Sequence, residues 1–301
     1  MRPGKCLQLA GLRRVVAVSV HSQTGGFVPQ IFSGRRLVAG LALMVVVPLS
    51  LQSSAGAQNA PMCPNEAQTP IAGTAGNDTI NGTPGADRIL AGDGNDVVNG
   101  LQGADCVRGG NGFDELEGGA GTDTIVGEAG PDRLSGGLDG DRLLGGEGFD
   151  FLSGGLGNDN LDGEGGPDDM NGDRGADTIR GGDDIDFAEG GLGRDRIEGG
   201  DNRDRLSGGE DPDRLDGGAG NDRLSGGLDG DRLSGGPGND KIDGGDGRNR
   251  YFGGSGRDVI DAANGSVERI SCGSGRDVVR ADARDRLRGC ARVFRLNLVI
   301  P

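Results

Sequence analysis

Large apolar residues recur every nine residues along most of this chain, from Ile80 to Ile260. Most are flanked by polar residues, and the six positions between the flanking residues of successive apolar centres are rich in glycine. Because strand side chains alternate between two faces, the pattern x-U-x predicts a very short strand, such as Thr124–Val126, that buries its central residue. The glycine-rich segments can form tight turns but no core, so we expect strand and turn to alternate once per nine residues.

A strict period requires every repeat to adopt the same unit, which excludes an ordinary mixed globular fold. With two nonapeptides per turn, residues eighteen apart stack, and the predicted fold is all-β, a parallel β-roll (right-handed solenoid) of about 21 nonapeptide repeats. Ala188 is the single small core residue, which marks its repeat as a local weak point. One sheet would bury Ile80, Val98, Leu116, Leu134, Leu152, Met170, Ala188, Leu206, Leu224, Ile242 and Ile260, and the other Ile89, Val107, Ile125, Leu143, Leu161, Ile179, Ile197, Leu215, Leu233 and Tyr251.

An aspartate lies two residues before each apolar centre, at twenty of the twenty-one positions of this phase from Asp78 to Asp258. The exception, Asn249, keeps an oxygen but loses the charge. Glycine lies two residues before most of these aspartates. It is replaced only by Asp or Asn, the side chains that best tolerate a left-handed backbone, which predicts that the conformation persists there. The replacements are Asp139, Asp184, Asn202, Asp211 and Asp229.

Stacking would place the aspartates in files, that is, rows parallel to the roll axis. Successive carboxylates of one file would be about 4.8 Å apart, a distance at which like charges repel. We therefore expect the chain to be expanded or disordered without a cation. Calcium takes six to eight oxygen ligands, which carboxylates and turn carbonyls can supply, whereas magnesium demands a small octahedron and substitutes poorly. Ion binding would then contribute folding free energy.

The unit G-G-x-G-x-D-x-U-x resembles the RTX, or haemolysin-type, calcium-binding repeat, over about residues 73–262. Eight blocks match G-G-x-G-x-D fully, among them GGNGFD, GGAGTD, GGLGND and GGSGRD. The resemblance implies multiple Ca²⁺ ions as cofactor. In the full matches it implies the ligands Asp114, Asp123, Asp150, Asp159, Asp195, Asp222, Asp240 and Asp258. In degenerate turns it implies Asp78, Asp87, Asp96, Asp105, Asp132, Asp141, Asp168, Asp177, Asp186, Asp204, Asp213 and Asp231.

A basic residue follows the aspartate phase in ten repeats, and these side chains should point outward. One interpretation is a solvated face that partly neutralises the aspartate files. The other is a basic stripe that binds an anionic glycan or a surface. The residues are Arg88, Arg133, Arg142, Arg196, Arg205, Arg214, Arg223, Arg232, Lys241 and Arg250.

Residues 1–57 are predicted to be an export signal. Residues 1–27 of it are predicted to result from a start codon that was assigned too early. Arg35 and Arg36 precede a short apolar run, and Ala55–Ala57 resembles a cleavage site. The run is short for a bilayer, so we expect secretion to the extracellular space and no membrane insertion after cleavage. The remaining organisation is a linker or cap at 58–75, the roll at 76–262 and a C-terminal cap at 263–301.

Four cysteines follow the predicted signal, and an oxidising compartment favours their pairing. The roll would rise about 40 Å between Cys106 and Cys272 at strand spacing, too far for a disulfide. The predicted pairs are Cys63–Cys106 and Cys272–Cys290; free thiols are the alternative.

Catalytic signatures are missing from the sequence after residue 57, since His21 is the chain's one histidine. This argues against Ser–His–Asp, Cys–His and H-E-x-x-H chemistry. Without residues 1–57, which hold six basic and no acidic residues, the net charge falls from −16 to −22, which disfavours nucleic acid as a partner. The sequence thus predicts a secreted calcium-binding protein, not an enzyme, that folds outside the cell. The alternatives are an adhesion or scaffold protein with a glycan or cell-surface partner, and a fragment of an RTX enzyme whose catalytic partner is separately encoded.

Overall fold

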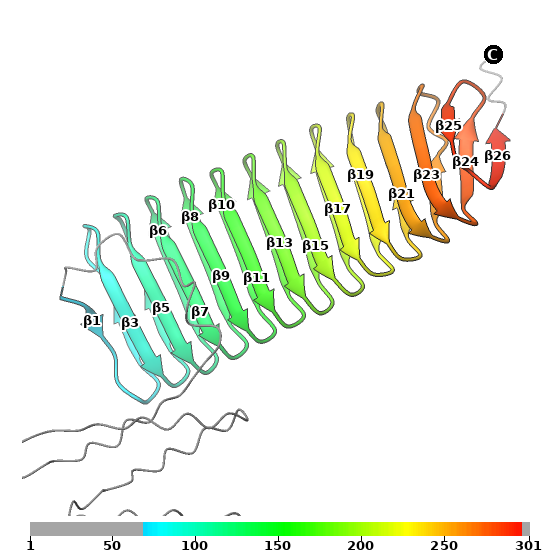
Figure 1. The fold of residues 1–301 in the computed structure, drawn as a ribbon. Coiled ribbons are helices and arrows are strands. Elements are labelled where there is room, and N and C mark those ends of the chain that lie inside the picture. The colour runs from blue at the N-terminus through cyan, green and yellow to red at the C-terminus, as the bar shows by residue number, and fades with distance from the viewer. Residues whose placement is uncertain (1–68, 297–301) are drawn as a thin grey trace, which may run out of the picture. The chain divides into compact units, whose positions relative to one another are not determined.

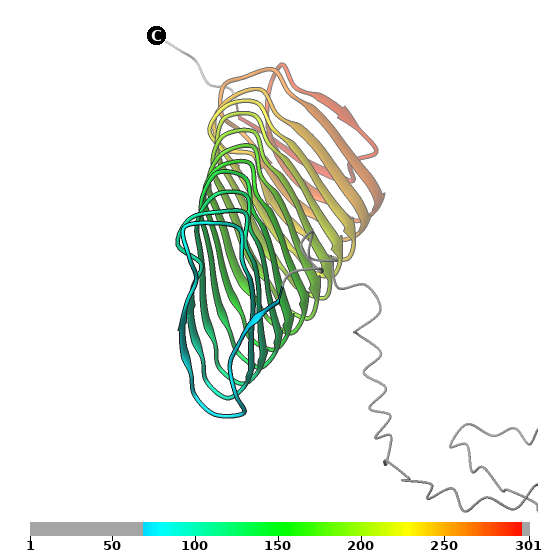
Figure 2. The same ribbon diagram turned by 90° about the vertical axis from the view of Figure 1, so that its left-hand side faces the viewer.

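The computed structural model describes residues 69–296, which fold as a parallel β-solenoid of about twelve turns (Figure 1). Successive strands alternate between two parallel sheets of thirteen strands each, and the described residues contain no helix. The turns stack behind one another, so the two sheets face each other across one narrow core (Figure 2). The predicted all-β roll is therefore confirmed. The predicted signal at 1–57, the linker up to residue 68 and the last five residues lie outside the described residues.

One sheet contains the odd-numbered strands in chain order. We refer to it as the odd sheet. Its strands are β1 (Ile71–Ala72), β3 (Arg88–Asp93), β5 (Cys106–Asn111), β7 (Thr124–Ala129), β9 (Arg142–Glu147), β11 (Asn160–Gly165), β13 (Thr178–Asp183), β15 (Arg196–Asp201), β17 (Arg214–Ala219), β19 (Arg232–Pro237), β21 (Arg250–Gly256), β23 (Arg269–Gly275) and β25 (Arg286–Arg288).

The facing sheet, the even sheet, contains the remaining strands, also in chain order. These are β2 (Thr79–Asn81), β4 (Val97–Asn99), β6 (Glu115–Ala120), β8 (Arg133–Leu138), β10 (Phe151–Leu156), β12 (Asp169–Arg174), β14 (Phe187–Leu192), β16 (Arg205–Glu210), β18 (Arg223–Gly227), β20 (Lys241–Asp243), β22 (Val259–Ala262), β24 (Val278–Asp282) and β26 (Arg292–Leu296).

The register follows the predicted period of eighteen residues. In the even sheet Leu152 pairs with Leu134 on one side and with Met170 on the other. Both predicted core files are buried along their whole length, from Ile80 to Ile260, and form one continuous hydrophobic cluster. Two apolar side chains per turn are thus stacked on their equivalents, and each sheet contributes one file.

The strands are longer than predicted. The sequence pattern indicated three-residue strands such as Thr124–Val126, but β7 runs on to Ala129, and most strands have six residues. The reason is that in most repeats the glycine pair after the apolar centre also joins the ladder, as Gly137 does opposite Gly155. Only about three residues are left for the turn, and the aspartate is the last of them.

Positive backbone φ persists where the turn glycine is replaced. Asp139, Asp184, Asn202, Asp211 and Asp229 have φ of 70–75°, which confirms the conformational interpretation of their positions. A second position of positive φ was not predicted from the sequence. It lies five residues after the aspartate, and non-glycine residues occupy it at Leu101, Glu128, Glu164 and Asp173.

The last turns loosen the register without ending the sheets. Arg250 pairs with Arg269, nineteen residues on, and Arg269 pairs with Arg286, seventeen residues on. The predicted disulfide Cys272–Cys290 is present and joins residues eighteen apart. Cys106 is fully buried, and its predicted partner Cys63 lies outside the described residues, so that pair stays a prediction. No helix long and apolar enough to span a membrane occurs between residues 69 and 296.

Candidate metal sites along the aspartate files

The predicted ligand aspartates end the turns, directly before the strands, and their side chains are directed into the roll. From Asp96 to Asp258 each of them is at most 4% exposed. Asp78 and Asp87, in the first turn, are half-buried. Full burial of so many carboxylates is costly unless each finds a compensating partner.

One carboxylate oxygen has such a partner in the neighbouring turn. The backbone N–H of Asp150 donates to Oδ1 of Asp168 at 2.9 Å, and the N–H of Asp168 donates to Oδ1 of Asp186 at 2.9 Å. The same bond repeats from Asp78 onward, always to the residue eighteen positions later until the register loosens. Each carboxylate therefore links its own turn to the preceding turn by a hydrogen bond.

The second carboxylate oxygen, Oδ2, is buried and has no hydrogen-bond partner among the described residues. Such orphaned buried oxygens are rare in folded proteins, because each forfeits its hydration without compensation. They belong to Asp96, Asp105, Asp114, Asp123, Asp132, Asp141, Asp150, Asp159, Asp168, Asp177, Asp186, Asp195, Asp204, Asp213, Asp222, Asp231, Asp240, Asp258 and Asp277.

Glycine leaves the space in which these oxygens lie. A Cβ on Gly136 would collide with Oδ2 of Asp141 and with the carbonyl oxygen of Gly154 in the next turn. A Cβ on Gly163 would meet Asp168 and Gly181 in the same way. A carboxylate oxygen and a backbone carbonyl thus converge beside each of these glycines. This explains why the position four residues after the aspartate is almost always glycine.

Burial raises the pKa of most of these carboxyls, and the charges of neighbouring aspartates raise it further, although the backbone N–H bond acts in the opposite direction. Asp168 and Asp213 reach a pKa of about 8, and Asp132 about 7. The ionised form is therefore unfavourable in the folded chain unless positive charge is brought beside Oδ2.

Calcium fits this environment. It is a hard cation that prefers carboxylate and carbonyl oxygens, the two atom types that converge at each glycine. Between residues 69 and 296 no group of three or more His, Cys, Asp or Glu side chains is arranged to hold a metal ion. A calcium shell of six to eight oxygens would thus have to draw on backbone carbonyls as well as on Oδ2.

The family sequence model of the RTX calcium-binding nonapeptide repeat matches the chain six times, at residues 72–105, 102–134, 135–170, 171–206, 198–233 and 225–260. The chain belongs to this family. RTX nonapeptide repeats bind Ca²⁺ at multiple sites, and the buried aspartate files are consistent with that chemistry. A search of curated protein sequences found no significant match.

The first turn of the RTX roll departs from the rest. Oδ2 of Asp78 accepts from the backbone N–H of Thr74 at 2.6 Å and from its hydroxyl at 2.9 Å. Thr83 binds Asp87 in the same two ways. Because protein donors already satisfy these oxygens, Asp78 and Asp87 have less need of a cation than the predicted ligands that follow.

Asn249 interrupts the regular series of aspartate carboxylates, because its amide side chain carries no charge. Its Oδ1 accepts from the N–H of Asp231 at 2.8 Å, so the ladder continues through it. Its Nδ2, in place of the second oxygen, donates to the carbonyl of Asp246 at 3.3 Å, and the Tyr251 hydroxyl lies nearby. An amide N–H cannot bind a cation, so this repeat offers one candidate ligand atom fewer.

Three further carboxylates extend the ladder beyond the predicted set. Glu268 accepts from the N–H of Asn249 at 3.3 Å, Asp277 from that of Asp258 at 3.2 Å, and Asp285 from that of Glu268 at 3.0 Å. In the sequence they follow at spacings of ten, nine and eight residues. These uneven spacings were the available signal, and bends in the last turns absorb them.

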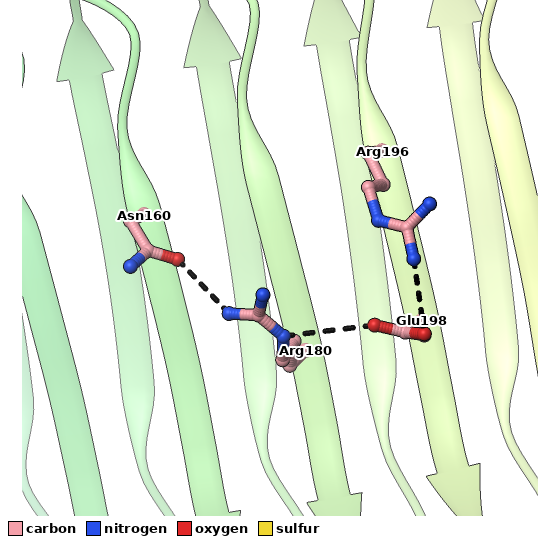
Figure 3. A network of polar contacts seen from close by, with 4 residues as sticks. All are labelled: Asn160, Arg180, Arg196 and Glu198. Carbon is pink, nitrogen blue, oxygen red and sulfur yellow. Dashed lines mark hydrogen bonds and ion pairs between the residues drawn. The ribbon is translucent and has the colours of Figure 1, made fainter.

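The basic residues after the aspartates lie on the outer faces, as the alternation predicts. On the odd sheet, Glu198 accepts a hydrogen bond from Arg196 at 3.1 Å and forms an ion pair with Arg180 at 3.6 Å (Figure 3). Arg180 also donates to Asn160 at 3.3 Å. Part of the basic surface is therefore neutralised locally by an acidic side chain on the same strand or the adjacent one.

Proposed function

We propose that this chain is a secreted calcium-binding protein that folds as the ions bind and has no catalytic activity of its own. The observation that carries the proposal is the repeated, buried Oδ2 without a protein partner, next to a carbonyl at a glycine that cannot be substituted without collision. Calcium, when bound, supplies the positive charge and the oxygen coordination that these groups lack.

We assign the ligand role to the aspartates whose Oδ2 is orphaned, which includes all eight in fully matching repeats. Asp78 and Asp87 are the least supported of the predicted ligands, since Thr74 and Thr83 bind them. The protein's own part is to hold each Oδ1 on a backbone N–H, which fixes the carboxylate and leaves Oδ2 directed at the glycine.

Folding and binding are coupled in this proposal. Without calcium the roll must bury files of carboxylates whose pKa values lie near or above neutrality, which opposes folding at pH 7. Since the sites exist only when turns stack, ion binding contributes directly to folding free energy. We expect affinities of about 10⁻⁴–10⁻³ M per site, the extracellular range.

Far-ultraviolet circular dichroism of the full chain during a calcium titration tests the proposal. We expect a cooperative change from a disordered to a β spectrum with Ca²⁺ and little change with equal Mg²⁺. A chain that is already β-rich in chelator, and whose stability calcium does not raise, would contradict it.

Secretion is proposed on the N-terminal sequence alone, which has paired arginines, an apolar run and small residues before Gln58. Expression of the full chain, followed by N-terminal sequencing of the protein in the medium, tests it. We expect a mature chain that begins near Gln58. Retention of the full-length chain inside the cell would contradict secretion.

A further inference from the structure

An open notch of about 400 Å³ lies on the outer surface at four consecutive turns, those that lead into β15, β17, β19 and β21 of the odd sheet. We refer to it as the arginine notch. Its lining residues are Arg194, Asp195, Pro212, Asp213, Arg214, Gly230, Asp231, Arg232, Arg248 and Arg250.

The notch exists because side chains of different size occupy one turn position. Arg194, Pro212, Gly230 and Arg248 are eighteen residues apart, each directly before an aspartate-phase residue. Pro212 and Gly230 leave the middle two turns open, whereas the long side chains of Arg194 and Arg248 stand at the two ends. The opening is therefore bounded along the roll axis by two guanidinium groups.

Three further arginines line the notch, each at the first residue of a strand. Arg214, Arg232 and Arg250 are paired in register on adjacent strands, about 4.8 Å apart, and all three are exposed. Arg232 lies over the ring of Phe252 at 4.6 Å. This contact orients its guanidinium group but does not neutralise its charge.

The five arginines of the notch form no salt bridge and no side-chain hydrogen bond within the described part of the chain. This contrasts with Arg196, one turn before Arg214, which Glu198 holds. The aspartates of the lining do not neutralise them either. Asp195, Asp213 and Asp231 are at most 4% exposed, and Oδ2 of each is buried in the roll.

We propose that the arginine notch binds a linear anionic polysaccharide, carboxylated or sulfated, which lies along the roll axis. An extended chain with an anionic group on each sugar presents its charges in a row, as the notch presents guanidinium groups in a row. Arginine matches carboxylate and sulfate oxygens with two parallel N–H donors. The inference rests on the proposed function, because the notch exists only when the turns are stacked.

Nucleic acid and membrane fit the notch less well. Binding of single-stranded nucleic acid uses aromatic platforms for successive bases, and among residues 69–296 Phe252 is the one aromatic ring packed against these arginines. A flat bilayer surface cannot enter a recess between turns.

A second groove on the even sheet provides a matched control. It contains Arg205, Arg223 and Lys241, which are likewise exposed and in register, but Asp243 and Asp261 also line it. Asp243 is exposed and Asp261 is half-buried beside Arg280, so carboxylates compete with an anionic ligand there. Equal removal of positive charge from the two grooves therefore separates a defined site from a general effect of charge.

The experiment measures binding of the full chain to labelled oligogalacturonate, a short carboxylated probe, at a calcium concentration at which circular dichroism shows a folded roll. A dextran sulfate oligomer, neutral dextran and a single-stranded oligonucleotide of similar length are the other arms. The variants are Arg214→Gln/Arg232→Gln/Arg250→Gln, Arg194→Gln/Arg248→Gln, and the control Arg205→Gln/Arg223→Gln/Lys241→Gln. Dichroism of each variant in calcium verifies its fold.

We expect at least one acidic glycan to bind, with an affinity that falls as salt rises, and neutral dextran not to bind. The triple substitution in the notch should weaken binding roughly tenfold or more, the double substitution severalfold, and the control triple less than about twofold. No glycan binding by a chain that is folded in calcium overturns the notch and leaves the calcium proposal intact. Equal losses in the two triple variants, or tighter binding of the oligonucleotide, also overturn it.

Discussion

Asp150 and Asp168, equivalent residues in adjacent turns, are joined by a backbone N–H to Oδ1 bond of 2.9 Å, and Oδ2 of Asp168 has no partner among the described residues. The two oxygens of one carboxylate thus have separate tasks. One fixes the side chain to the preceding turn, and the other is held beside a glycine carbonyl without a donor of its own.

Asp168→Asn retains an acceptor for the Asp150 N–H but removes the negative charge and replaces one oxygen by an N–H donor. We expect the calcium concentration at the folding midpoint to rise, with a loss on the order of 0.5–3 kcal/mol of calcium-dependent stability. Dichroism-monitored titration measures it. Asp169→Asn, at the adjacent and exposed residue, is the control and should leave the midpoint unchanged. Equal midpoints for the two variants would show that Asp168 is not a ligand.

Gly136→Ala places a Cβ against Oδ2 of Asp141 and the carbonyl of Gly154. We expect a loss of about 1–3 kcal/mol in urea unfolding with calcium present, the usual range for overpacking a tight interior. In Gly85→Ala the new Cβ meets only the Thr83 hydroxyl at 4.0 Å, so stability should hardly change. If the two alanines cost the same, the oxygen cradle beside Gly136 has no energetic importance.

Protonation of the buried carboxyls should partly substitute for calcium in stabilising the fold. Carboxyls such as Asp168 and Asp213, at about 8, and Asp240, at about 7, have folded pKa values above the unfolded value of about 3.9. Their stabilising contribution is complete below the unfolded pKa and is lost as pH rises through the folded values. In chelator we therefore expect β signal to grow as pH falls from about 8 toward about 4. A calcium-free chain that is more folded at pH 9 than at pH 5 would have the opposite linkage.

Loss of the Cys272–Cys290 bond should loosen the C-terminal turns. The bond closes a segment of eighteen residues, so replacement of both cysteines by alanine is expected to cost about 3 kcal/mol. Hydrogen exchange measured by mass spectrometry in calcium localises the effect. Faster exchange should be confined to β21–β26, whereas the turns around β8–β12 keep their protection. Unchanged exchange in β23 and β25 would mean that packing alone holds this end.

Most of the fold was predictable because one rule is repeated many times. The nine-residue period fixed the strand positions, the two core files and their register, since a stacking distance of eighteen residues follows directly from two strands per turn. Asp or Asn replaces the turn glycine two residues before Asp141, Asp186 and Asp204. These replacements indicated a left-handed backbone position, whereas glycine alone could equally have indicated flexibility.

The details that escaped the sequence depend on contacts between turns. Strand length was underestimated because the paired glycines have no side-chain pattern to report their place in the ladder. Asp78 and Asp87 look like the other predicted ligands in sequence, yet Thr74 and Thr83 satisfy their oxygens. The position of Glu268, ten residues after Asp258, is recognisably aspartate-like in the sequence, but its bond to the Asn249 N–H depends on bends that compensate for that spacing.

Because consecutive strands alternate between the two sheets, the effect of adding or removing nonapeptide repeats depends on whether their number is even or odd. Deletion or duplication of eighteen residues changes the length by one turn, about 4.8 Å, and returns every later strand to its own sheet. A change of nine residues instead rotates everything downstream by half a turn. Arg88 and Arg232, which now share the outer face of the odd sheet, would then face opposite directions. Recombination between such similar repeats can therefore change the length of this protein. Only the gain or loss of an even number of nonapeptide repeats, however, preserves the arrangement of its surfaces.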